Sequence, residues 1–349
     1  MIASTSQLAG LLPKLQSFDR VAIDTEADSL HSYFEKLCLL QLSFDGQDHL
    51  IDPLAGFDLT PLSAALAGKE IVLQGADFDL RLMRRSFGFV ASHIFDTVIA
   101  ARLLGIREFG LAALVERFFQ VQLPKGSQKA NWAQRPLPAR MAEYAINDTH
   151  YLLPLAEKLE HALIERLRLE WFRESCQRAI EQASVDRMRA EDDAWRIAGS
   201  GALRGRAAAV LRALWHWRDR EARAADRPPF HILQNNQLIA AATRFDADEV
   251  PDFRHFSPRR RREFLAAADK ALHSSENEWP ASRRRVGIRP TMEAERRASK
   301  LRERRDEAAA QLEIEASFIA PRPVLEAIAV DETRKEKLLV SWQRSLLGL

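Results

Sequence analysis

The sequence has little of what marks a secreted or membrane-bound protein. Its 349 residues include two cysteines, Cys38 and Cys176, too few for a disulfide framework and not spaced as a pair of metal ligands. No apolar run reaches the roughly 18 residues that span a bilayer. The N-terminus lacks a basic segment ahead of a long apolar stretch, so it predicts an amphipathic helix and not a signal peptide. Together these absences predict a cytoplasmic protein with no membrane partner.

Motifs of nucleotide-dependent and serine enzymes are also missing. The chain has no P-loop and no G-x-G-x-x-G, and Gly199, Gly201 and Gly205 are wrongly spaced for either. No G-x-S-x-G sequence is present. The sequence therefore excludes an ATP-driven helicase and predicts no nucleotide cofactor.

The net charge of +2 conceals two halves of opposite sign. Residues 201–349 hold 29 Lys and Arg against 22 Asp and Glu, a net charge of +7, which leaves −5 for residues 1–200. An acidic half joined to a basic one suggests that the second half holds an anionic partner such as nucleic acid. A difference of this size is also common between unrelated domains, so charge alone leaves the partner open.

The first half alternates strand and helix patterns, which indicates an α/β domain with a mixed sheet. The second and third apolar runs are close enough in sequence to pair as a hairpin across a glycine-containing turn. Strands are predicted at Val21–Asp24, Leu37–Phe44, His49–Asp52 and Glu70–Leu73, and helices at 60–68, 77–87, 97–104, 110–118 and 138–166.

Beyond residue 166 the pattern is helical. Apolar residues recur at helical spacing and form a stripe on one helix face, which predicts that this face packs on a core. The stripe consists of Leu203, Val210, Leu214 and Trp217. A break at 279–292 predicts an exposed basic linker, and further helices are predicted at 293–312 and 323–330.

Two acidic residues close the first predicted strand. Asp24 and Glu26 are two positions apart, so on a strand both side chains point to the same face. Carboxylates held side by side repel each other unless a cation lies between them. The alternative is an ordinary solvated strand end, and the pair alone does not decide between the two.

Further candidates follow on predicted helices. Asp79 lies near the start of a helix, where an acidic residue also serves as an ordinary cap, although Asp77 could take that role and leave Asp79 for another. Tyr144 and Asp148 are four apart and stack on one helix face. Taken alone, such a pair is more often half-buried packing than a site.

In this order, the positions resemble the DEDD exonuclease superfamily, in the subgroup with a tyrosine in its last motif. The neighbouring sequence resembles ribonuclease D almost continuously over residues 19–165, which is more specific than any single motif. The resemblance implies a ribonuclease H-like exonuclease domain. The stretches that carry it are DTEADSLHSYFEKLCLLQLS (24–43), FDTVIAARLLG (95–105), LPKGSQKANWAQRPL (123–137) and YAINDTHYLLPL (144–155).

The same resemblance implies a catalytic arrangement. Asp24, Glu26, Asp79 and Asp148 would bind two divalent cations, Mg²⁺ or Mn²⁺, and Tyr144 would position or deprotonate the attacking water. Such hard cations prefer oxygen ligands, and two of them about 4 Å apart stabilise charge on both the attacking and the leaving oxygen of a phosphodiester. Hydrolysis would then release nucleoside 5′-monophosphates.

One loop is a candidate for substrate binding. Lys125, Gln128 and Trp132 would contact the substrate backbone or stack on a base. The alternative is an ordinary exposed loop that the tryptophan anchors, and the sequence favours neither.

Three further positions are weaker candidates. Tyr33, with its neighbours Phe34 and Lys36, falls between the first two strands, where a terminal nucleotide would be gripped. Asp96 is expected to cap the helix after it, with bracing of the site as the alternative. Gln74 occupies a position where relatives more often carry histidine, so the role of that position is in doubt.

The second half resembles the helicase-and-RNase-D C-terminal (HRDC) domain, a small helical module, through WRD, RPPF and the helix that follows. Two basic clusters, Arg259–Arg262 and Arg283–Arg285, would track a phosphate backbone or form only a solvated helix end and linker. The predicted organisation is an exonuclease domain at 1–165, a connecting helical segment at 166–200, an HRDC domain at 201–278, and a basic linker with a diverged, second HRDC-like helical region at 279–349.

The leading hypothesis is a metal-dependent 3′–5′ exoribonuclease acting on tRNA precursors or other structured RNA with a free 3′ end. One alternative is a non-catalytic RNA-binding protein on a nuclease scaffold, which predicts the loss of acidic positions that this chain retains. Another is a DNA 3′–5′ exonuclease of the same fold, with single-stranded DNA as the partner, since no residue establishes recognition of a 2′-hydroxyl.

Overall fold

The computed structural model describes residues 1–124, 126–185, 193–281 and 291–349. These residues form two compact units. The described parts of 1–27, 37–186 and 288–349 make up one, which we name the sheet unit. The described parts of 28–36 and 187–287 make up the other, which we name the helical unit.

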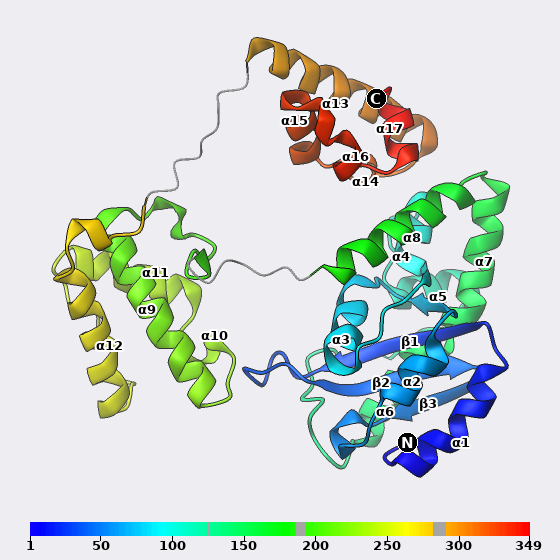
Figure 1. Ribbon diagram of the computed structural model, residues 1–349, viewed down its shortest axis with the longest axis horizontal. Coiled ribbons are helices and arrows are strands. Elements are labelled where there is room, and N and C mark those ends of the chain that lie inside the picture. The colour runs from blue at the N-terminus through cyan, green and yellow to red at the C-terminus, as the bar shows by residue number, and fades with distance from the viewer. Residues whose placement is uncertain (125, 186–192, 282–290) are drawn as a thin grey trace. The chain divides into compact units, whose positions relative to one another are not determined.

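The sheet unit is built on five strands in the order β3-β2-β1-β4-β5. β1 pairs antiparallel with β2, which pairs antiparallel with β3, and these three strands lie side by side in Figure 1. β4 pairs parallel with both β1 and β5, so the predicted mixed sheet is confirmed. The strands are β1 (Arg20–Ala27), β2 (Leu37–Phe44), β3 (Gln47–Ile51), β4 (Glu70–Leu73) and β5 (His93–Asp96).

The predicted hairpin between the second and third strands is also confirmed. Asp45 and Gly46 join β2 to β3, and both have a positive φ, 54° and 65°. Two consecutive positive φ angles are the mark of a type I′ turn, whose twist matches that of the paired strands. Asp-Gly is a preferred sequence for this turn because glycine adopts positive φ without a steric penalty.

Eight α-helices of the sheet unit lie among the described residues up to 185, and strands and helices both contribute to this part, as the predicted α/β domain requires. They are α1 (Thr5–Gln16), α2 (Thr60–Leu66), α3 (Asp77–Phe87), α4 (Thr97–Leu103), α5 (Leu111–Phe119), α6 (Ala139–His150), α7 (Leu152–Glu165) and α8 (Leu169–Ser184).

One predicted helix, at 138–166, is in fact two. α6 ends at His150 and α7 begins at Leu152. Pro154 explains the break, because a proline ring collides with the carbonyl group four residues earlier, here that of His150, and supplies no N–H donor. The break lets α6 pack against β1, β2 and β3 while α7 packs against β4, α4 and α5.

The C-terminal helices belong to the sheet unit, and three of them place residues in its hydrophobic core, among them Ala309, Ile319 and Trp342. Trp342 stacks on Trp171 of α8 with ring centroids 5.2 Å apart, and its Nε1 donates to Ser175 Oγ at 3.1 Å. Gly105 has a φ of +76°, and a Cβ there would collide with the carbonyl oxygen of Glu313. These helices are α13 (Met292–Leu312), α14 (Ala316–Ile319), α15 (Arg322–Val330), α16 (Lys335–Leu338) and α17 (Ser341–Leu347).

The helical unit has its own aromatic core. Trp217 is 1% exposed, and its ring centroid lies 4.9 Å from that of Phe264 and 5.6 Å from that of Phe256. Val210 and Leu214 are buried in the same core, as the predicted stripe requires. The helices are α9 (Gly205–Ala224), α10 (Pro229–Ile232), α11 (Asn235–Asp246) and α12 (Pro258–Leu272).

The predicted basic cluster at the start of α12 divides into two pairs. Arg259 and Arg260 each bind the buried carboxylate of Glu221 on α9 at 2.9 Å. A buried carboxylate needs such partners, so these two arginines hold α12 against α9. Arg261 and Arg262 are exposed. The second cluster, Arg283–Arg285, lies outside the described residues, as does most of the predicted linker.

Neither cysteine forms a disulfide bond, and both are buried. Burial raises the pKa of the Cys176 thiol, so it stays protonated and unreactive. Across the described ranges, none of the helices combines the length and the apolar character needed to cross a membrane.

We predict that Trp342→Ala lowers the free energy of unfolding of the sheet unit by about 3–5 kcal/mol, the usual cost of removing a buried aromatic side chain. The substitution deletes both the stack on Trp171 and the bond to Ser175. Urea denaturation followed by circular dichroism measures the change. Phe230→Ala, at a side chain that is 45% exposed in the helical unit, is the control and should change little. Equal effects of the two substitutions would contradict this account.

Candidate active site

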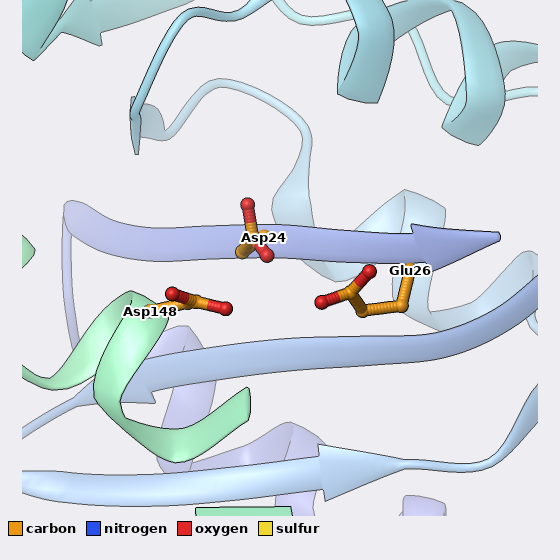
Figure 2. Close-up of side chains that lie close together, drawn as sticks. All are labelled: Asp24, Glu26 and Asp148. Atoms are coloured by element: carbon orange, nitrogen blue, oxygen red, sulfur yellow. The ribbon is translucent and has the colours of Figure 1, made fainter. Parts of the chain in front are cut away.

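The fold brings three of the predicted carboxylates together. Asp24 and Glu26 project from the same face of β1, opposite Gln41 and Leu39 of β2 in the register. Asp148 comes from the end of α6, which packs on β1, β2 and β3. Each of the three carboxylates offers an oxygen within 4.8 Å of the others, and Figure 2 shows them turned toward one another.

The fourth predicted carboxylate, Asp79, lies beside this group in the first turn of α3. It is 5% exposed, and its Oδ1 accepts a hydrogen bond from the Thr25 hydroxyl. Its charge raises the pKa of Asp24 and of Asp148, so it acts on the same site. Asp77 does not cap α3; it is the first helical residue and pairs with Arg81.

Crowding and burial make the ionised form of every one of these carboxyls costly. Burial, with the charges of Asp148 and Asp79, raises the pKa of Glu26 to about 9. Burial raises the pKa of Asp148 to about 7, with Asp79 adding to the shift. The pKa of Asp79 also rises to about 7 through burial, although the hydrogen bond from Thr25 opposes the shift. Ionising all of these groups together at neutral pH is therefore unfavourable unless a cation compensates their charge.

Tyr144 is one helical turn before Asp148 on α6, as its spacing predicts. Burial and the charges of Asp148 and Glu26 raise the pKa of its phenol, while a hydrogen bond with the Gln128 side chain opposes the shift. The Tyr144 ring packs against Trp132, with centroids 6.1 Å apart. The tyrosine thus contacts the predicted substrate loop and lies near enough to Asp148 and Glu26 for their charges to act on its phenol.

The three residues predicted to bind substrate in one loop differ in their structural positions. Lys125 lies outside the described residues. Gln128 is exposed and bonds Tyr144. Trp132 is 1% exposed and packs with Leu39 and Met141, so its ring is not available to a base. This favours the anchoring alternative for the tryptophan, whose buried indole also packs against Tyr144.

Tyr33 groups with the helical unit. Its hydroxyl lies 2.8 Å from Asp219 Oδ1, and its main-chain N–H donates to Asp226 at 3.0 Å. Phe34 is 51% exposed. The proposed grip on a terminal nucleotide by these residues stays a prediction.

Asp96 both caps α4 and braces the start of α3. Its carboxylate accepts bonds from the N–H groups of Val98 and Ile99, and also from those of Gly75 and Ala76. The second pair fixes the turn that leads to Asp79, so both predicted roles are present in one side chain.

Gln74 has a structural role. Its amide donates to the Phe109 carbonyl at 2.8 Å and accepts from the Thr97 hydroxyl. These bonds tie the end of β4 to α4 and to the segment before α5, and neither involves a carboxylate of the site.

Two residues next to the carboxylates were not singled out from the sequence. Thr25 bonds Asp79, and the Gln41 Nε2 lies 3.4 Å from Asp24 Oδ2. The signal for Gln41 was a glutamine in the middle of the apolar run LCLLQLSF, because a polar residue inside a buried strand needs a partner.

Two family models match the chain. The model of a 3′–5′ exonuclease domain matches residues 1–164, and the model of the HRDC domain matches residues 207–264. Ribonuclease D of Haemophilus influenzae is 30% identical over 285 residues, which are 79% of this chain and 71% of that protein. This chain belongs to the ribonuclease D family. The family resemblance drawn from the sequence is thereby confirmed.

Ribonuclease D of Escherichia coli is 34% identical over 252 residues, or 69% of this chain. The match spans 65% of that protein, less than two thirds of its length. The crystal structure of Escherichia coli RNase D, an exoribonuclease involved in structured RNA processing, covers 100% of this chain and 96% of its own, with 25% identity and a TM-score of 0.74. The predicted fold class, an exonuclease domain followed by an HRDC-type helical region, is confirmed.

The donor set suits a divalent cation. All the ligand atoms offered by Asp24, Glu26 and Asp148 are carboxylate oxygens, which hard cations such as Mg²⁺ and Mn²⁺ prefer over nitrogen or sulfur. A bound cation would also relieve the repulsion that raises the pKa values of these groups. Divalent metal binding therefore fits the residues present.

We predict that, in EDTA, the stability of the protein falls as pH rises from about 6 to 9. Raised folded pKa values, about 7 for Asp79 and Asp148 and about 9 for Glu26, mean that the folded state binds more protons than the unfolded state in this range. The contribution is present at low pH and is lost as each group ionises. Thermal unfolding at several pH values measures it.

Glu26→Gln is the control, because a neutral amide does not ionise and should flatten the dependence. Saturating Mn²⁺ should flatten it as well, since a bound cation compensates the charge. Identical slopes for the wild type and Glu26→Gln would contradict the prediction.

Proposed function

We propose that this chain is a metal-dependent 3′–5′ exoribonuclease of the ribonuclease D type. The observation that carries the proposal is the convergence of Asp24, Glu26 and Asp148, with ligand oxygens within 4.8 Å, in a member of that family. Partly buried carboxylates at this separation repel each other, so the arrangement lowers stability unless a cation binds. A scaffold that only bound RNA would have no need of such a group.

Asp24, Glu26, Asp79 and Asp148 would hold two Mg²⁺ or Mn²⁺ ions. When bound, such ions stabilise the charge that develops on the attacking and leaving oxygens and lower the pKa of a bound water. β1 and α6 supply three of the carboxylates and the first turn of α3 supplies Asp79. Strand and helix ends are rigid supports, which suits a reaction that depends on positioning.

Tyr144 would position the attacking water or accept its proton. The hydrogen bond with Gln128 and the contact with Trp132 restrict where the phenol can point. Water would attack the terminal phosphorus, the bond to the preceding 3′-oxygen would break, and a nucleoside 5′-monophosphate would leave.

As substrates we propose tRNA precursors or other structured RNA with a free 3′ end. The solved Escherichia coli relative is an exoribonuclease involved in structured RNA processing, and the match to an HRDC domain at 207–264 is compatible with a nucleic-acid partner. Single-stranded DNA is the alternative, and the 2′-hydroxyl is what would separate the two.

The domain organisation at 1–165, 166–200, 201–278 and 279–349 also stays a proposal. The family matches at 1–164 and 207–264 support its first and third parts. Within the helical unit, Arg261 and Arg262 are exposed at the start of α12, which makes them candidates for phosphate contacts.

We predict that the protein shortens a 3′-tailed RNA hairpin stepwise with Mg²⁺ or Mn²⁺ and not with EDTA. Loss of a residue that only orients a metal ligand lowers activity by roughly 10- to 100-fold. Asp148→Ala removes a proposed ligand itself, so it should lower the rate by more than this. Denaturing gels follow the shortening, and chromatography identifies the 5′-monophosphates. A DNA strand of the same sequence shows which sugar is preferred. RNA that is bound but never shortened with any metal would support the non-catalytic alternative.

We predict that replacing both Arg261 and Arg262 with alanine weakens RNA binding and reduces its salt dependence. Each lost contact to a single-stranded phosphate should lower the slope of log K against log salt by about 0.7. Fluorescence anisotropy with labelled RNA at several salt concentrations measures the slope. Arg244→Ala is the control, because that side chain pairs with Glu249 at 3.1 Å on the surface of the same unit. An unchanged slope would show that Arg261 and Arg262 of α12 do not contact RNA phosphates.

A further inference from the structure

β2 contributes no carboxylate to the site, yet it lies between the two other strands of the antiparallel part of the sheet, and every one of its residues is buried. Two of them are polar, Gln41 and Ser43, at 0% and 4% exposure. They are two positions apart on one strand and therefore share a face. The Asp24 side chain lies on this same face of the sheet, since Asp24 is the cross-strand neighbour of Gln41. Polar groups in a buried strand are costly and call for a reason.

Gln41 holds the first carboxylate. Its Nε2 donates to Asp24 Oδ2 at 3.4 Å, while its Oε1 has no hydrogen-bond partner among the described residues. The reverse orientation of the amide would bring two oxygens together, so the amide nitrogen faces the carboxylate. One long bond and one unpaired acceptor contribute little to stability. The glutamine is therefore better explained by what it does to Asp24 than by packing.

Ser43 holds the segment next to the second carboxylate. Its Oγ lies 2.6 Å from Asp48 Oδ1 and 2.7 Å from Thr149 Oγ1. A carboxylate only accepts and Ser43 has one proton, so Ser43 donates to Asp48 and accepts from Thr149. Asp48 Oδ2 also lies 2.7 Å from His150 Nδ1. The two residues that follow Asp148 are thus both tied to the β2–β3 hairpin.

We propose that Gln41 and Ser43 are positioning residues that hold Asp24 and Asp148 at the separation a divalent cation requires. Gln41 acts on Asp24 directly, and Ser43 acts on Asp148 through Thr149. This inference rests on the proposed metal-dependent function. Its chemical basis is general: residues that hydrogen-bond to metal ligands orient them and so affect how tightly the site binds the metal ion.

Mn²⁺ binding to the full chain, measured by isothermal titration calorimetry, tests the inference without relying on activity. Gln41→Met keeps the length of the side chain and removes its donor, and Ser43→Ala removes the hydroxyl. Each should weaken Mn²⁺ binding about tenfold, the lower end of what such partners contribute. Ser43→Thr keeps a hydroxyl and should restore the affinity. In a double-mutant cycle, Ser43→Ala with Thr149→Val should lose no more than either change alone.

Two control variants separate positioning from stability. Gln47→Met replaces an exposed glutamine of the same hairpin, and Ser175→Ala removes a hydroxyl that bonds Trp171 and Trp342. Both should leave the Mn²⁺ affinity unchanged, even where Ser175→Ala lowers the melting temperature. If the Gln41→Met and Ser43→Ala variants fold and bind Mn²⁺ within twofold of the wild-type affinity, the positioning inference is wrong, but the proposed function is not affected. A wild type that binds no Mn²⁺ overturns the proposed function and the inference with it. If Gln41→Met does not fold, the serine and threonine variants decide the outcome.

Discussion

Repulsion among carboxylates held close together and away from water is the constraint on which the rest of the structure depends. Asp24, Glu26 and Asp148 cannot lie within 4.8 Å of one another at neutral pH without a cost, and Asp79 adds to it from α3. Burial raises the pKa of all four carboxyls, and the charges of neighbouring site carboxylates add to the shift at Asp24, Glu26 and Asp148. The remaining sheet unit must supply the stability that this group subtracts, and its continuous hydrophobic core does so.

The elements that carry the carboxylates are fixed at their ends by side chains from neighbouring strands. Asp96 of β5 accepts bonds from the N–H groups of Gly75 and Ala76, just before α3. Ser43 and Asp48 of the β2–β3 hairpin bind the end of α6. The α3 attachment uses main-chain N–H groups, whereas the end of α6 is held through the side chains of Thr149 and His150. Each attachment lies next to a proposed metal ligand, which links the packing of the sheet to the geometry of the site.

The sequence predicted most of the sheet because the patterns there are local. Apolar runs marked four strands, and a glycine-containing turn marked the hairpin between two of them. β5 was not predicted, because its only apolar residues are Ile94 and Phe95 and it leads directly into the predicted helix at 97–104. The break between α6 and α7 was missed although Pro154 was visible, because the helical periodicity continues on both sides of the proline. In the structure Pro154 lies in the first turn of α7, where a proline is tolerated.

Spacing alone predicted which candidate side chains share a face, while their roles were inferred from the family resemblance. Asp24 and Glu26 share a strand face, and Tyr144 and Asp148 share a helix face. The burial of Trp132 and the packing of Trp342 on Trp171 depend on contacts between segments far apart in sequence, which no local pattern contains. Gln41 belongs to the same class, because its partner became known only with the register of β1 against β2.

The central claim is that the carboxylates of β1 and α6 form a divalent metal site. Anomalous X-ray diffraction from crystals soaked in Mn²⁺ tests this most directly, since it locates the ion without reference to activity. The account predicts an anomalous peak at coordination distance, about 2 Å, from oxygens of Asp24, Glu26 and Asp148. No peak at these residues under saturating Mn²⁺, or peaks only elsewhere on the molecule, would contradict it.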